Sequence, residues 1–425
     1  MSLPAGWAET TLGHIGEYLN GRGFRKSEWR ERGRPIIRIQ NLTGSSNHVN
    51  YFDGEAEEHY TARRGDLLVS WAATLGVFVW DGPEAVVNQH IFKVRSRIDQ
   101  SFHYYLLLSV LGDLRRQTHG SGMVHITKSR FEETPVELPP IAEQRRIVAA
   151  IEEQLSRLDA AEESLRRAQH RIETLRAAAL TAASTGFPIE FGSLVSDLRY
   201  GTSLKCTYDG PGVPVLRIPN VIGGRVDASD LKRATDAEVD LSAFRVDAGD
   251  LLFVRTNGSR DLIGRVAVVD GADGMAFASY LIRARPDESR LDSKYAVIAL
   301  STPSARALIQ SKAATSAGQY NLNLKALRSL PVPLPPLGEQ RRIVAEVERQ
   351  LSLADALQAA IGRALKRSAA LRRAILERAF TGKLVPQDPS DEPASTLLER
   401  IAAERAKSEV ATGRRPRRRA TMKAS

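Results

Sequence analysis

The chain has 425 residues, of which 42% are hydrophobic and 26% are charged, and its formal net charge is +10. This length and balance predict a globular protein with about two or three hydrophobic cores, and they exclude an intrinsically disordered chain. A single cysteine, Cys206, excludes an internal disulfide framework and a thiolate metal cluster, as is typical of a reducing compartment.

The sequence carries no signal for a membrane or for export. Its longest apolar run, Tyr104 to Leu111, is far shorter than the roughly 20 residues that a membrane-spanning helix needs. The first residues, MSLPAGWAET, lack the basic and apolar regions of a signal peptide. We therefore expect a cytoplasmic protein with no membrane partner.

Residues 1–140 predict a mixed α/β domain. Short segments such as PIIRIQNL and GDLLVSWA are rich in Val, Ile and Leu and are bounded by turn residues, which is typical of β-strands. Its polar and basic side chains fall on probable loops, where they are suited to base edges and phosphates, although a solvated loop is the alternative for each one singly. The candidate DNA-binding residues here are Arg22, Arg25, Lys26, Arg38, Asn41, Trp71, His125 and Lys128.

Residues 141–186 predict one long helix. A Pro-Pro pair precedes it and Thr185-Gly186 ends it, as expected for helix boundaries. Apolar side chains recur at three- and four-residue spacing over about five heptads, and the remaining surface is polar, which indicates a coiled-coil seam. The expected seam residues are Val148, Ile151, Leu155, Leu158, Leu165, Ile172 and Leu175.

Residues 187–336 predict a second mixed α/β domain that resembles the first. VPVLRIPN matches RPIIRIQN, and GDLLFV matches GDLLVS. The Gly-started basic loop GTSLK lies in a place equivalent to that of GRGFRK in the first domain, and VRTNGSRDLIG follows a strand equivalent to the one before SWAATLG. These loops again offer side chains suited to bases and phosphates. The candidate DNA-binding residues here are Ser203, Lys205, Arg217, Asn220, Arg255, Asn257, Ser259, Arg260, Gln319, Tyr320 and Asn321.

Residues 337–385 repeat the long helix. LPPIAEQRRIVAAIEEQLS, starting at Leu138, returns as LPPLGEQRRIVAEVERQLS at Leu334, with 14 of 19 positions identical at an offset of 196 residues. The seam residues expected in this copy are Val344, Val347, Leu351, Ile361, Leu371 and Ile375. An exposed apolar stripe roughly 66 Å long needs a partner, and the other copy is the nearest one. Because a globular domain lies between the copies, we expect an antiparallel coiled coil with pseudo-twofold symmetry and an α+β fold.

Residues 386–425 predict a basic, largely flexible tail. Its last 13 residues, GRRPRRRATMKAS, carry five Arg, one Lys and no acidic residue. This segment is either a solvated end or a nonspecific phosphate-binding arm.

No pattern of catalysis is present. The sequence has no GxxxxGK phosphate loop, no CxxC or HExxH pair, and no Asn-Pro-Pro-aromatic or Asp-Pro-Pro-aromatic tetrapeptide of an amino-methyltransferase. We therefore predict no catalytic residue, no metal site and no bound cofactor. The helices of the two halves are alike while their loops differ, which favours two unlike half-targets held apart by a fixed spacer.

Two variable domains, each followed by a helix that opens with LPP-x-x-EQRRIV and closes with TG, resemble the specificity subunit of type I restriction-modification systems. The resemblance covers Leu3 to about Val385. It implies that each variable domain is a target recognition domain for one half of a bipartite asymmetric DNA target. The start of the second domain, FGSLVSDLRYG, lacks the Trp found near the start of the first.

The resemblance also implies partners. The paired helices would set the spacer length and dock two modification subunits, and restriction subunits would complete the complex. S-adenosylmethionine, ATP and Mg would lie on those partners, while this chain would be non-catalytic. The expected subunit-interface residues are Glu143, Gln144, Arg145, Arg146, Glu339, Gln340, Arg341 and Arg342.

Two alternatives belong to other classes. A coiled-coil adaptor between two proteins would explain the helices without sequence-specific DNA binding. A stand-alone nuclease or methyltransferase would need motifs that the sequence lacks.

Overall fold

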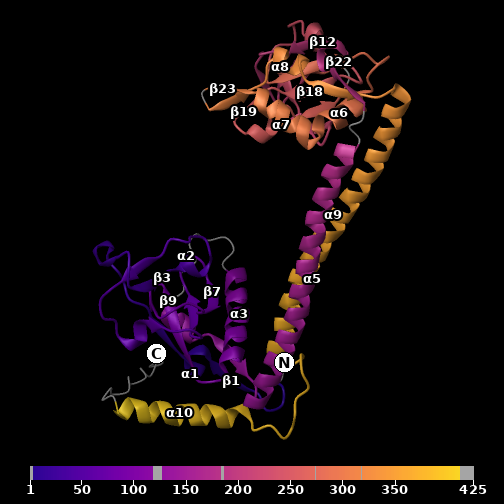
Figure 1. Cartoon of the computed structure of the whole chain (residues 1–425). Coiled ribbons are helices and arrows are strands. Elements are labelled where there is room, and N and C mark those ends of the chain that lie inside the picture. The colour runs from indigo at the N-terminus through magenta and orange to yellow at the C-terminus, as the bar shows by residue number, and fades with distance from the viewer. Residues whose placement is uncertain (1–2, 118–126, 183–185, 273, 317, 412–425) are drawn as a thin grey trace. The chain divides into compact units, whose positions relative to one another are not determined.

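The computed structural model describes residues 3–117, 127–182, 186–272, 274–316 and 318–411. The chain forms two compact units, here called unit 1 (Met1–Glu163 with Leu365–Ser425) and unit 2 (Ser164–Ala364) (Figure 1). Each unit contains one variable domain and a part of each long helix. Among the described residues, no helix has the length and apolar character that crossing a bilayer requires.

Unit 1 contains two four-stranded sheets. The first has the order β2-β9-β6-β7 with antiparallel neighbours, formed by β2 (Gly16–Asn20), β9 (Ile91–Ser96), β6 (Leu67–Ser70) and β7 (Gly76–Val79). The second has the order β4-β3-β8-β5, formed by β4 (Asn50–Phe52), β3 (Arg34–Ile37), β8 (Ala85–Val87) and β5 (Thr61–Ala62). Strand β6 begins with three apolar residues, Leu67, Leu68 and Val69, and all four of its side chains, including that of Ser70, are buried.

Helix α3 (Gln100–Gln117) packs on the first sheet of unit 1. Its His103 is fully buried, and its ring nitrogens lie 2.8 Å from the Tyr18 hydroxyl and 2.9 Å from Ser96 Oγ. Burial lowers the pKa of His103 to about 3, so the ring is neutral and can satisfy both hydroxyls. Strands β1 (Ala8–Thr11) and β10 (Pro135–Leu138) pair beside helix α1 (Leu12–Ile15), and β10 leads through Pro139-Pro140 into α5 (Ile141–Ala182).

The segment after α9 (Leu337–Phe380) folds back onto unit 1 and ends in helix α10 (Ala394–Ala411). Ala394 and Ile401 of α10 are buried in the core of unit 1, and Arg405 donates a hydrogen bond to Gly13 O, 3.0 Å away. The region expected as a flexible tail therefore includes an ordered helix, because TLLERIAAERA presents an apolar face to α1. The Arg-rich residues 412–425 lie outside the described residues.

Unit 2 repeats the plan of unit 1. Its six-stranded sheet has the order β12-β22-β18-β20-β16-β15, formed by β12 (Val195–Tyr200), β22 (Leu281–Pro286), β18 (Leu251–Val254), β20 (Val266–Val268), β16 (Arg225–Val226) and β15 (Val221–Ile222). Its second sheet has the order β13-β17-β14-β21, formed by β13 (Cys206–Thr207), β17 (Lys232–Ala234), β14 (Pro214–Leu216) and β21 (Ala276–Phe277). The parallel pair β14-β21 places Leu216 opposite Phe277, as β3-β8 places Ile37 opposite Val87.

The remaining elements of unit 2 surround these sheets. Helices α6 (Ser293–Ser301) and α7 (Pro303–Lys312) stand where unit 1 has α3, and α8 (Leu324–Arg328) matches α4 (Lys128–Glu132). Strands β11 (Phe187–Glu190) and β25 (Pro331–Leu334) pair as β1 and β10 do. A further sheet, β19-β24-β23, is formed by β19 (Thr256–Asn257), β24 (Gln319–Asn321) and β23 (Ala314–Ser316), and the described part of unit 1 has no such sheet.

Within each unit the α5 and α9 segments lie side by side (Figure 1). In unit 1, Arg372 forms ion pairs with Asp159 and, at 3.2 Å, with Glu162. In unit 2, Arg176 forms an ion pair with Asp355. The two arginines are 196 residues apart, and so are the two aspartates. The same ion pair therefore recurs with the helices exchanged, which confirms the expected antiparallel pairing of the two copies.

The seam residues do not all lie between the helices. Ile151, Ile172, Val344, Val347, Ile361 and Ile375 are buried, and Val148, Leu155, Leu158, Leu165 and Leu351 are half-buried. Leu175 and Leu371 differ from the expectation, since their side chains are 64% and 44% exposed. At this equivalent turn of each helix the next residue, Arg176 or Arg372, faces the other helix and forms the ion pair instead.

Candidate nucleic-acid interface

Three loops meet at one end of the first sheet in each unit, and we call this region the loop edge. Strands β2 and β6 both run antiparallel to the central β9, so their carboxyl ends lie beside the start of β9. Strands β12, β18 and β22 repeat this arrangement in unit 2. The loop edge comprises residues 21–26, 71–75 and 88–90 in unit 1, and residues 201–205, 255–264 and 278–280 in unit 2.

A glycine allows the first loop to approach the third. A Cβ atom at Gly21 would lie 2.2 Å from Asn88 O, and one at Gly201 would lie 2.3 Å from Phe277 O. Such distances are too short for any other residue without a shift of the backbone. The next residues then form parallel bridges, Arg22 with Asn88 and Thr202 with Ala278. The two basic loops singled out in the sequence therefore occupy equivalent places.

In unit 1 the loop edge contains one arginine, Arg22, whose charge is paired within the chain, and two cations that are exposed. The guanidinium of Arg22 lies 4.8 Å from the ring centres of Phe24 and of Phe52, and it forms an ion pair with Glu28. The Arg25 backbone N–H and the Arg22 guanidinium hold the pKa of Glu28 below its usual value. The side chains of Arg25 and Lys26 are exposed, so they are the cations of this loop that a phosphate can reach.

Trp71 and Arg255 occupy the same position in the two units. The Trp71 backbone N–H donates to His90 O at 3.3 Å, and the Arg255 N–H donates to Tyr280 O at 2.8 Å. The Trp71 ring stacks on Phe92, with ring centres 5.6 Å apart. The Arg255 guanidinium instead lies 4.1 Å from the ring centre of Tyr200. One backbone site thus presents an indole in unit 1 and a cation in unit 2.

Two segments of unit 2 that contain candidate DNA-binding residues, and that are distant in the sequence, pair with each other in one β-sheet. RTNGSR contributes β19 and GQYN contributes β24, and the strands pair Thr256 with Asn321 and Asn257 with Tyr320. The Thr256 hydroxyl donates to Asn321 Oδ1 at 2.7 Å, and Asn257 Oδ1 accepts from the Ser259 N–H at 2.8 Å. The exposed candidates of unit 2 are Ser203, Lys205, Ser259, Arg260 and Gln319.

The side chains of Asn41 and Asn220 stabilise turns through hydrogen bonds to nearby backbone groups. Asn220 is buried; its Oδ1 accepts from the Arg217 N–H at 2.7 Å, and its Nδ2 donates to Asp227 O and Asp230 O at 2.7 and 2.8 Å. Asn41 repeats this arrangement, accepting from Arg38 N at 3.1 Å and donating to His48 O at 2.9 Å.

The neighbours of these asparagines are also engaged. Arg38 lies 5.2 Å from the Trp29 ring centre, and Arg217 pairs with Asp230 at 3.4 Å. The RIQN and RIPN segments therefore have a structural reason for their likeness. Lys128 begins α4 and pairs with Glu132 at 3.5 Å, while His125 lies outside the described residues.

The third loop of each edge was missed by the sequence reasoning. Gln89 and His90 of unit 1 and Tyr280 of unit 2 are exposed, and Ser279 is half-buried. Residues 88–90 (NQH) and 278–280 (ASY) contain no basic Lys or Arg and no glycine, so the local sequence does not mark them as a DNA-binding loop. Their place immediately before the central strand was the only available clue.

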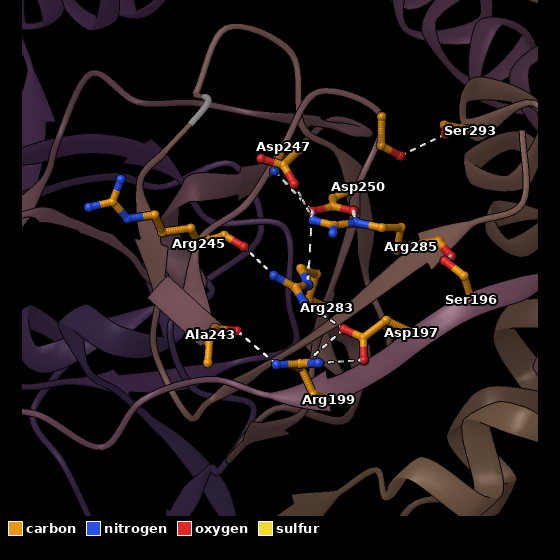
Figure 2. A network of polar contacts seen from close by, with 11 residues as sticks. Ser196, Asp197, Arg199, Ala243, Arg245, Asp247, Asp250, Arg283, Arg285 and Ser293 are labelled. Carbon is orange, nitrogen blue, oxygen red and sulfur yellow. Dashed lines mark hydrogen bonds and ion pairs between the residues drawn. The ribbon is translucent and has the colours of Figure 1, made fainter. Parts of the chain in front are cut away.

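A closed charge network in unit 2 belongs to the scaffold. Arg199 donates to both oxygens of Asp197, and Arg285 donates to both oxygens of Asp250 (Figure 2). The buried Arg283 lies between them, bonded to Asp197 at 2.5 Å and to Arg245 O. In unit 1 Lys93 and Asp66 form the matching ion pair at 3.0 Å. Because its charges are balanced internally, this network offers little to a phosphate.

The Gln of each EQRRIV motif joins the variable domain to its helix. Gln340 is fully buried; its Nε2 donates to Pro335 O and Arg290 O at 2.8 Å each, and its Oε1 accepts from the Asp292 N–H at 2.8 Å. Gln144 repeats the joint, donating to Pro139 O at 2.9 Å and accepting from Asp99 N at 3.2 Å. Asp99 and Asp292 precede α3 and α6, so the motif fixes the start of α5 or α9 against its own domain.

The other motif residues differ between the copies. Glu143 is buried and accepts from Trp7 Nε1 at 3.1 Å, and burial raises the pKa of its carboxyl group. Glu339 is only half-buried and pairs with Arg342 at 2.6 Å. Glu143 also accepts from Gln387 Nε2 at 3.3 Å, whereas unit 2 has no tryptophan to match Trp7. Arg146 pairs with Asp391 at 2.6 Å.

The motif also has exposed arginines, Arg145 and Arg341. Their side chains form no hydrogen bond or ion pair within the described part of the chain. These two side chains are therefore open to a partner, and their role at a subunit interface stays a prediction.

Comparisons with known proteins agree with this repeated geometry. The model of the type I restriction modification DNA specificity domain matches residues 4–172 and again 196–366. The chain is 26% identical to the type I restriction enzyme EcoBI specificity subunit of Escherichia coli, over 96% of this chain and 94% of that protein. It is 31% identical to the EcoKI specificity subunit of Escherichia coli strain K12, over 68% of each chain.

The fold has a solved neighbour as well. A chain described in work on complex assembly and conformational transition of the type I R-M system matches with a TM-score of 0.72, over 90% of this chain and 100% of that chain, at 21% identity. The sequence match covers both halves, and each half carries two corresponding sheets, a buried Gln that joins the domain to its helix, and a loop edge. The chain therefore belongs to the family of type I restriction-modification DNA specificity subunits, and it has two target recognition domains.

Proposed function

We propose that the two loop edges read the two unlike halves of a bipartite, asymmetric DNA target. One observation carries this proposal: equivalent backbone positions present different chemistry in the two units. Trp71 in unit 1 corresponds to Arg255 in unit 2. The short loop 71–75 likewise corresponds to the longer loop 255–264, which contributes to an added β-sheet. Two domains reading the same half-site would have reason to keep these side chains alike.

The paired helices support a spacer of fixed length. Each helix is bonded to its own domain through a buried Gln, so a domain has little freedom to turn about its helix. The antiparallel pairing is held by the repeated Arg-Asp ion pairs and by buried aliphatic side chains. The separation of the half-sites would then follow from the length of the paired helices.

Catalysis belongs to partner subunits in this proposal. Among the described residues no group of three or more His, Cys, Asp or Glu is placed to hold a metal ion. Two modification subunits would supply S-adenosylmethionine and take the target base out of the duplex, and restriction subunits would supply ATP- and Mg-dependent cleavage. The family relationship supports these partners, and the exposed Arg145 and Arg341 are candidate contacts for the modification subunits.

Methylation-motif sequencing tests the proposal. The chain is reconstituted with a modification subunit of a type I restriction-modification system from the same organism and is incubated with unmodified genomic DNA. We expect methylation within a motif of two different specified blocks that are separated by unspecified bases. Assembly of the complex without any sequence preference would favour a coiled-coil adaptor, and methylation by the isolated chain would favour a stand-alone enzyme.

A further inference from the structure

The third loop of each loop edge is a rigid turn that connects the two sheets. In unit 1 it runs from β8 to β9, and the Ile91 N–H donates to Asn88 O at 3.0 Å, which closes a β-turn. In unit 2 the Leu281 N–H closes the same turn on Ala278 O at 2.9 Å. We call residues 88–90 and 278–280 the connecting turns.

Both connecting turns are bonded to their neighbours in the same way. Asn88 N donates to Ile37 O at 3.1 Å, and Ala278 N donates to Leu216 O at 2.9 Å. On the opposite side, Arg22 N donates to Val87 O at 2.8 Å, and Thr202 N donates to Phe277 O at 2.9 Å. The backbone of the turn is therefore fixed by both sheets, and side chains on it start from a well-defined position.

The side chains on these turns are exposed and chemically different in the two units. Unit 1 presents Gln89 and His90, whose Nε2 atoms lie 3.2 Å apart, and the His90 ring packs edge-on against Trp71 at 5.5 Å. Unit 2 presents Ser279 and Tyr280, and the Tyr280 side chain is 56% exposed. Amide, imidazole and hydroxyl groups both donate and accept hydrogen bonds, as readout of base edges requires.

Cations lie on the adjoining loops of each edge. Arg25 and Lys26 are exposed on the first loop of unit 1, and Lys205 is exposed on the first loop of unit 2. Phosphate contacts position a protein on the duplex, whereas polar side chains beside them read the bases. A neutral, rigid turn flanked by exposed cations has this arrangement.

We propose that the connecting turns determine base specificity, with Gln89 and His90 reading the half-site of unit 1 and Tyr280 with Ser279 reading that of unit 2. This inference rests on the proposed DNA-reading function of the loop edges. It assigns specificity to residues that carry no net charge and lie outside the basic and Asn-rich loops. Gln89 is suited to adenine, whose N6 and N7 atoms match the donor and acceptor of an amide.

The test uses the reconstituted complex and variants of exposed side chains. The double variant Gln89→Ala with His90→Ala is compared with His59→Ala, a partly exposed histidine in the 3-10 turn that precedes β5 of unit 1. Tyr280→Ala is compared with Phe187→Ala, whose ring is 87% exposed on β11 of unit 2. Methylation-motif sequencing and competition with mismatched duplexes then give the discrimination at each base.

Each turn variant should lose about tenfold or more discrimination at one or two bases of its own block, with the other block unchanged. Tyr280→Phe separates the two modes of contact: restored discrimination assigns reading to the ring, and lost discrimination assigns it to the hydroxyl. Unchanged discrimination in both turn variants would overturn the inference, as would equal loss in both blocks. If the wild-type complex itself methylates without a bipartite motif, the proposed function fails before any variant is compared.

Discussion

Replacement of Gln340 by alanine tests the joint between a recognition domain and its helix. The amide is fully buried and makes three hydrogen bonds of 2.8 Å, to Pro335 O, Arg290 O and the Asp292 N–H. Each bond contributes about 1 kcal/mol net, and a buried group left without a partner adds a penalty of about 1–3 kcal/mol. We expect the free energy of unfolding of unit 2 to fall by about 4–6 kcal/mol. For a unit of about 200 residues this lowers the melting temperature by roughly 8–24 °C.

Differential scanning calorimetry of the full chain measures this change. Gln350→Ala is the matched control, because Gln350 lies on the same helix and, among the residues that the structure describes, its side chain bonds only to the exposed Glu346 carboxylate, at 2.6 Å. The control should shift the free energy of unfolding by no more than about 0.5 kcal/mol. Equal melting temperatures for the two variants would refute the reasoning that the buried Gln fastens the domain to α9.

Three further predictions use other parts of the chain. Because burial lowers the pKa of His103 to about 3 from an ordinary value of 6.5, the unfolded chain binds a proton that the fold excludes, and stability falls as the pH drops below 6.5. Urea unfolding should show a loss of about 2 kcal/mol between pH 7 and pH 5 that His103→Asn removes. Gly201→Ala should weaken target binding in a mobility-shift assay, because its Cβ would lie 2.3 Å from Phe277 O, whereas Gly338→Ala enters open space and should leave binding unchanged. Arg145→Glu combined with Arg341→Glu should reduce assembly with the modification subunit on a sizing column while the methylated motif of the remaining complex stays the same.

The long helices were predictable because their signals are local. A three- and four-residue apolar spacing, a Pro-Pro start and a Gly end lie within one segment, and α5 and α9 begin at Ile141 and Leu337, directly after those prolines. The antiparallel pairing followed from chain connectivity. The exposure of Leu175 and Leu371 was not predictable, because it depends on the partner that Arg176 and Arg372 find on the other helix.

The candidate site was predictable only in outline. Glycine and basic residues marked the first loops, and the loop edges do contain them. Asn41 and Asn220 were selected for their base-reading chemistry, but their amides bond carbonyl groups that lie seven to ten residues away. The connecting turns were overlooked because their position depends on strand pairing between distant segments, which a local pattern does not encode.

The central claim is that each unit reads a different half of the target. Methylation-motif sequencing of complexes that carry Trp71→Ala or Arg255→Ala tests it most directly, since these side chains occupy the same backbone position in the two units. The account predicts that Trp71→Ala alters one block of the motif and that Arg255→Ala alters only the other. Alteration of the same block by both variants, or of neither block, would contradict it.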